Sequence, residues 1–237
     1  MKKLLLLGLC LHTFSAWAQW GRTYEEVATT VYLRANDPGR LKALAEEAAR
    51  SPEAYLVPIW QPAELLTVGN TKRQVREARY NVAHGLLEVQ DSAGGFRVFP
   101  PGSLRGFTLG QGQQSRRFFT RLCRGTGSDR EFVEVLTAEA AGPITIAFHH
   151  VFVDQPADIH PVLQVEIRKA RRVVIQEVLA GAGPAAPLQP LSLAKRNVLK
   201  LFGSRAKEVE TYATSNNLQY EQVQDVVRLA DYYNSLK

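Results

Sequence analysis

Cysteine and methionine are scarce in this chain of 237 residues, which holds two cysteines and one methionine. One cysteine, Cys10, lies in an apolar leader, so only Cys123 remains if the leader is removed. One cysteine cannot form an intrachain disulfide. The chain must therefore be stabilised by its core alone, which its length allows as one domain of ordinary size.

Recognisable catalytic signatures are also missing. The sequence has no Gly-x-Ser-x-Gly motif, no His-Glu-x-x-His motif, no phosphate-binding loop and no paired-carboxylate pattern. We therefore expect no cofactor, and the sequence favours a protein that is not an enzyme. An active site made of scattered residues stays open as an alternative.

Long apolar runs are absent after the N-terminus, and no later run approaches the ~20 residues of a membrane-spanning helix. Residues 1–18 have the form of a signal peptide. Two lysines precede an apolar core at residues 4–14, and a small-x-small pattern ends at Ala18. We expect cleavage after Ala18, which leaves Gln19 first and places the protein in the periplasm or outside the cell.

A lipoprotein signal at Cys10 is the weaker alternative. Leu9 stands where such sites have a small residue, and Cys10 lies inside the apolar core of the leader.

The charge is only modestly basic, with 29 Lys and Arg residues against 23 Asp and Glu residues, or +6. Loss of Lys2 and Lys3 with the leader lowers the excess to +4. An exported protein of this charge meets lipid head groups, lipopolysaccharide and cell-wall polymers, and no nucleic acid. The expected partner is another envelope protein or an anionic envelope polymer, although a solvated basic surface also explains the charge.

The clearest organisation lies between Glu77 and Leu109. Apolar and polar residues alternate in short runs that glycine, proline and aspartate separate. Such alternation indicates strands with one buried face, and the separators are turn residues. The segment predicts an antiparallel meander with strands near residues 77–82, 86–90, 96–99 and 104–109.

The rest of the chain frames this meander. Residues 19–52 predict a helical segment, in which Asp37-Pro38 starts a helix that ends near Arg50. Residues 53–179 predict the β domain, residues 180–190 a Pro/Gly/Ala loop, and residues 191–237 three short helices packed on the sheet.

The predicted fold class is α+β, mainly an antiparallel meander that forms a curved sheet or partial barrel. Within it, residues 162–167 and 173–178 predict two strands joined by a basic turn at residues 169–172.

Potential metal ligands are densest around His149 and His150, followed by Asp154 and His160. Zinc requires three or four such groups at one point. Adjacent strand residues point to opposite faces, so the two neighbouring histidines cannot bind one ion without a bulge. We therefore expect no metal site. Convergence of either histidine with Asp154 and Glu166 in a deep pocket would instead favour an enzyme.

A second candidate combines arginines with aromatic residues on one predicted strand. Such a surface could grip an anion or stack a ring. Arginine outnumbers lysine 20 to 9 throughout the chain, however, so a solvated strand face explains the cluster equally. The residues are Arg116, Arg117, Phe118, Phe119 and Arg121.

Several short motifs resemble those of a group of uncharacterised exported bacterial proteins. They cover residues 51–109 and 191–236. In order they are Pro52-x-x-Tyr55-Leu56, Trp60, Arg79-Tyr80-Asn81, Leu87-Glu88-Val89, Arg105-Gly106-Phe107 and Tyr232-Tyr233-Asn234-Ser235-Leu236. The resemblance implies export and a sheet with C-terminal helices, and it carries over no catalytic residue.

The leading hypothesis is a non-enzymatic binding or assembly module of the cell envelope. The alternative is an envelope hydrolase or carbohydrate-processing enzyme. A pocket where titratable residues converge would indicate the enzyme, and an exposed apolar patch would indicate the binding module.

Overall fold

The computed structural model describes residues 37–91, 95–124, 130–140 and 142–236. The predicted leader, its cleavage site at Ala18 and residues 19–36 of the segment predicted to be helical lie outside these ranges. The chain divides into two compact units, Met1–Arg40 and Leu41–Lys237, and the second contains the sheet. No helix in the described ranges is long and apolar enough to cross a membrane.

The first described helix, α2, spans Pro38–Ala48, as the Asp37-Pro38 signal predicts. The backbone N–H of Arg40 donates to the Asp37 carboxylate at 2.9 Å, which satisfies one of the free donors of the first turn. Leu41, Ala45 and Ala48 are buried at helical spacing along one side of the helix.

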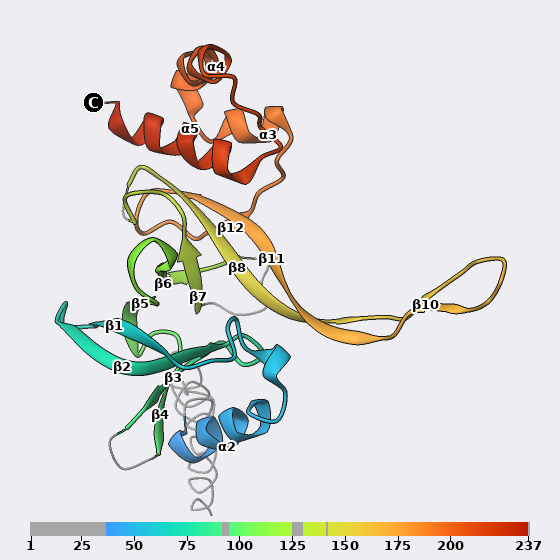
Figure 1. Cartoon of the computed structure of the whole chain (residues 1–237). Coiled ribbons are helices and arrows are strands. Elements are labelled where there is room, and N and C mark those ends of the chain that lie inside the picture. The colour runs from blue at the N-terminus through green and yellow to red at the C-terminus, as the bar shows by residue number, and fades with distance from the viewer. Residues whose placement is uncertain (1–36, 92–94, 125–129, 141, 237) are drawn as a thin grey trace, which may run out of the picture. The chain divides into compact units, whose positions relative to one another are not determined.

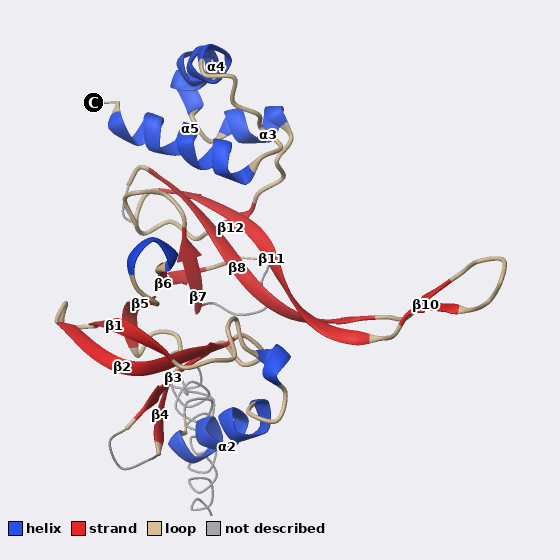
Figure 2. Cartoon of the chain, viewed as in Figure 1, coloured by secondary structure: helices blue, strands red, loops and turns tan. Residues whose placement is uncertain are grey.

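The sheet is antiparallel throughout and contains ten strands, with two more strands in a separate ribbon (Figures 1 and 2). Its order is β12-β11-β8-β7-β6-β5-β1-β2-β3-β4. The strands are β1 (Gln61–Thr67), β2 (Lys72–Asn81), β3 (Leu86–Gln90), β4 (Phe96–Phe99), β5 (Leu104–Leu109), β6 (Arg116–Leu122), β7 (Arg130–Val135), β8 (Ile144–Gln155), β11 (Arg171–Ala182) and β12 (Gln189–Pro190). The two-stranded ribbon pairs β9 (Asp158–Ile159) with β10 (Glu166–Arg168).

The connection from β4 to β5 shows why this sheet must curve. β4 is the edge strand. β5 lies four positions from β4 in the order, because β1, β2 and β3 stand between them. Four strand spacings amount to about 19 Å in a flat sheet, and the five steps from Phe99 to Leu104 span at most about 18 Å when fully extended. Turn residues shorten that reach, so the sheet coils, and the predicted curved meander is confirmed. It is not closed into a barrel.

The coiled part of the sheet encloses an aromatic core. The rings of Phe107 and Phe118 stack at 4.7 Å, and the rings of Tyr80 and Phe132 pack against them. All four side chains are buried. Tilted and edge-to-face contacts of this kind stabilise a core beyond the burial of area alone.

Strands β8 and β11 form the longest pairing, with twelve registered pairs from Arg171↔Gln155 to Ala182↔Ile144. The prediction of a basic turn at residues 169–172 is wrong, because Lys169 precedes β11 and Arg171 is already paired. The chain reverses earlier, between His160 and Val165, where Gln164 adopts a positive φ of 53°.

The C-terminal residues form α3 (Lys195–Lys200), α4 (Ala206–Ser215) and α5 (Val223–Ser235). Gly203 follows α3 with a positive φ of 52°, a conformation that glycine adopts without strain. Apolar residues of these helices share one buried cluster with Ile144 and Ile146 of β8. Asn234 fixes the last helix to that strand, because its side-chain amide exchanges two 2.8 Å hydrogen bonds with the backbone of Ile144.

Candidate interaction surface on the β8–β11 arm

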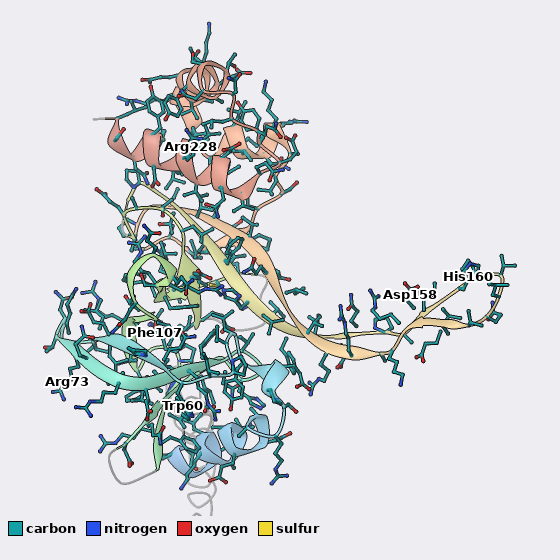
Figure 3. All side chains as sticks on the ribbon, viewed as in Figure 1. Trp60, Arg73, Phe107, Asp158, His160 and Arg228 are labelled. Carbon is teal, nitrogen blue, oxygen red and sulfur yellow. The ribbon has the colours of Figure 1, made fainter. Side chains whose placement is uncertain are left out.

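The last two registered pairs of the β8–β11 hairpin, the β9–β10 ribbon and the turn between its strands form one continuous arm, residues 154–172. Figure 1 shows this end of the hairpin extending beyond the other strands, and the side chains of Asp158 and His160 lie near its end (Figure 3). Every residue from Pro161 to Arg172 is exposed. No other segment of comparable length in the described ranges is exposed without interruption.

The end of the arm carries apolar side chains that a folded protein would normally bury. They come from both strands and from the turn between them, and we call them the apolar tip. They are Ile159 (53 % exposed), Val162 (81 %), Leu163 (67 %), Val165 (53 %) and Ile167 (59 %). An exposed apolar group of this kind marks an interaction site in a native protein.

His160 organises the turn at the tip. Its Nδ1 atom accepts hydrogen bonds from the backbone N–H groups of Val162 and Leu163, at 3.2 and 3.0 Å. The N–H of His160 donates to the Val165 carbonyl, and that of Gln164 donates to the His160 carbonyl. Because residue 161 is proline, every backbone donor from His160 to Gln164 is satisfied inside the turn.

Basic side chains follow the tip on the returning strand. They are Arg168, Lys169, Arg171 and Arg172, and all four are exposed. Arg172 pairs with Asp154 at 2.9 Å and lies over the Phe152 ring, 4.5 Å from its centroid. The arm thus has an apolar end and a charged stem, in which these four basic residues are accompanied by three acidic ones, Asp154, Asp158 and Glu166.

The four residues considered as metal ligands do not come together. His149 Nδ1 lies 3.3 Å from Glu177, and His150 Nε2 lies 2.7 Å from Glu134, so the neighbouring histidines contact different carboxylates. Asp154 pairs with Arg172, and His160 caps the turn. Within the described ranges, no group of three or more His, Cys, Asp or Glu residues could hold a metal ion.

The arginine and aromatic residues of β6 are occupied within the fold. Arg117 donates to the carbonyls of Thr137 and Ala138, and Arg121 donates to the carbonyls of Ala140, Gly183 and Ala186. Arg116 lies 3.9 Å from Glu134. Phe118 is fully buried, and Phe119 packs against a second apolar cluster. The two arginines thus donate hydrogen bonds to five backbone carbonyls of neighbouring loops.

A polar network that sequence reasoning missed surrounds Glu88 of β3. The Glu88 carboxylate is fully buried, and Arg79 Nε contacts it at 2.8 Å. Tyr55 and Asn81 also donate to it, each at 3.1 Å. The Arg79 guanidinium lies between the rings of Tyr55 and Trp60, 4.1 and 4.2 Å from their centroids.

This network unites residues that the sequence motifs contain separately. Burial raises the pKa of the Tyr55 hydroxyl above its ordinary value, and the Glu88 charge adds to that effect. The Arg79 guanidinium is held inside the fold by one carboxylate and two rings. We therefore assign the network to the stability of the fold.

Cys123 is buried beside the end of β6. Burial raises the pKa of its thiol to about 12. A thiol of this kind is inert, because the thiolate is the nucleophile.

Comparison of this chain with protein-family models, with curated proteins and with solved structures found no match.

Two features escaped the sequence analysis for different reasons. The apolar tip reads as an ordinary strand, because alternating apolar residues such as Val165 and Ile167 indicate one buried face. Glu88 reads as a solvated strand residue, because its partners lie 7 to 33 residues away. The proline at residue 161 was the one local signal for the turn.

Proposed function

We propose that this chain is an exported, non-enzymatic binding or assembly module of the cell envelope, and that it acts through the arm. The observation that carries the proposal is the apolar tip. Five apolar side chains there are more than half exposed. Exposure of this extent lowers solubility unless a partner covers the surface at least part of the time.

The buried ionisable side chains of the sheet contact one another, which supports a binding role for the exposed arm. Glu88 is paired with Arg79, and His150 is paired with Glu134. These groups pair within the sheet, whereas five of the nine large apolar side chains that are exposed in the described ranges lie on the arm.

Site-specific photo-crosslinking in the native host tests this function. A photoreactive residue replaces Val162 at the tip, and a matched control replaces Val68, which is 64 % exposed outside the arm. We expect adducts from position 162 only. Equal adducts at both positions, or none at position 162, would contradict a role for the arm.

Export is tested separately. Mass spectrometry of the protein from the envelope fraction should find an N-terminus at Gln19, and an intact Met1 would contradict export by this leader.

A further inference from the structure

The backbone N–H groups of the turn at the end of the arm are hydrogen-bonded within the turn, so the turn can enter an apolar medium at low cost. In an apolar medium each unsatisfied N–H costs several kcal/mol. All backbone donors from His160 to Gln164 have acceptors inside the turn, two of them on the His160 ring. The side-chain amide of Gln164 also donates inward, to the Pro161 carbonyl at 2.8 Å.

The side chains of the apolar tip are also suited to an apolar medium. They are contributed by β9, by the turn and by β10, and each is more than half exposed. The tip is therefore a convex apolar end. A folded protein would need a matching groove to cover it, whereas lipid chains rearrange around an inserted group.

The charges decide between a lipid surface and a second copy of the chain. Arg168 follows Ile167 directly, and Lys169 is next. From residue 154 to residue 172 the arm holds four basic side chains against Asp154, Asp158 and Glu166, a net charge of +1, so two copies meeting at their tips would bring surfaces of like net charge together. An anionic bilayer attracts this net positive charge, and Arg168 and Lys169 are the basic residues nearest the tip.

We infer that the apolar tip inserts shallowly into an anionic lipid bilayer, with Arg168 and Lys169 at the level of the phosphates. This inference rests on the proposed function of the arm and names its partner. Val165, at the end of the turn, and Arg168 are three residues apart, about 10 Å along an extended strand, which agrees with the 5–10 Å insertion of interfacial segments. Asp158 and Glu166 limit the depth, since their charges favour the head groups over the acyl chains.

A fluorescent probe at the tip tests the insertion. Val162→Cys is labelled with an environment-sensitive fluorophore in the protein as processed by its host, where buried Cys123 resists labelling. Val68→Cys is the matched control. With vesicles of 70 % phosphatidylcholine and 30 % phosphatidylglycerol, we expect a blue shift at position 162 and none at position 68. A blue shift that needs no vesicles and grows with protein concentration would overturn the inference in favour of a second copy.

Paired variants test which side chains carry the binding. Val162→Ser/Leu163→Ser removes the apex, and Ile59→Ser/Val68→Ser removes comparable exposed groups elsewhere. In vesicle flotation we expect the tip variant to lose at least tenfold in partitioning and the control to change less than twofold. Equal losses would overturn the inference.

The basic residues are tested in the same way. Arg168→Gln/Lys169→Gln should weaken binding to the anionic vesicles about 30-fold, whereas Arg73→Gln/Arg76→Gln, on exposed positions of β2, should change it little. Neutral phosphatidylcholine vesicles should bind more weakly than the anionic ones, and equal binding to both would overturn the role of charge.

The His160 cap provides a further readout. His160→Asn keeps a side-chain acceptor near the backbone donors and should retain insertion, whereas His160→Phe leaves two donors unpaired and should reduce it. Retention by both variants would overturn the argument from satisfied donors. If photo-crosslinking succeeds at position 162 while the vesicles fail to bind, the lipid inference falls and the binding function stands.

Discussion

Replacement of Glu88 by glutamine tests the buried network most directly. The change keeps the size of the side chain and an acceptor oxygen for Tyr55 and Asn81, but it leaves the Arg79 guanidinium without its counter-charge. The Glu88 side chain is 0 % exposed and that of Arg79 is 13 % exposed, so water screens the pair poorly. Removal of one partner from such a pair costs about 3–5 kcal/mol.

We expect the lower end of that range, about 3 kcal/mol, because the amide still accepts hydrogen bonds. Urea unfolding, followed by circular dichroism and by tryptophan fluorescence, measures the change. For a chain of this size the loss corresponds to a fall in melting temperature of about 6–12 °C.

An exposed ion pair supplies the control. Asp154 and Arg172 are 83 % and 58 % exposed, so Asp154→Asn should cost less than about 1 kcal/mol. The double variant Arg79→Met/Glu88→Met removes both charges and should be more stable than Glu88→Gln, since no buried charge is left unpaired. If Glu88→Gln costs no more than Asp154→Asn, or if the double variant gains nothing, charge pairing does not stabilise this network.

Three other perturbations have defined outcomes. Gly106→Ala should lower the melting temperature, because a Cβ atom there would collide with the backbone carbonyl of Phe118 on the adjacent strand, and thermal unfolding measures the loss. Asn234→Ala removes both hydrogen bonds to Ile144 and should cost about 1–3 kcal/mol in urea unfolding; an unchanged midpoint would show that α5 is held by its apolar face alone. Cys123 should resist iodoacetamide at pH 8 until the protein unfolds. Since its folded-state pKa is raised to about 12, the unfolded thiol ionises first, so the free energy of unfolding should fall as the pH rises above 9.

The sequence predicted the strands best where a single physical signal governs them. Residues 86–90, 96–99 and 104–109 alternate in polarity between turn residues, and the strands β3, β4 and β5 have these bounds. The helix from Pro38 follows from a cap and a proline. In each case the decisive residues lie within a few positions of one another.

The structure of the arm could not be predicted from local sequence patterns. Lys169 to Arg172 resemble a turn by composition, but the register of β8 with β11 extends to Arg171 and forces that segment to stay extended. Pairing between strands far apart in sequence is invisible to a local pattern. The exposure of Val162 and Leu163 was equally hidden, since an apolar residue in a sequence carries no sign of whether anything covers it.

The paired strands β8 and β11 also determine how far the apolar tip lies from the rest of the sheet. Each strand of twelve residues is about 40 Å long, and the three pairs nearest the tip, from Arg171↔Gln155 to Val173↔Val153, lie outside the cluster that contains the aromatic core, whereas the fourth, Val174↔Phe152, packs against it. Insertion or deletion of two residues in each strand would therefore change its reach by about 7 Å while keeping the same faces of the ribbon. The standoff distance between the tip and the sheet can thus vary in small steps without any change in the packed interior.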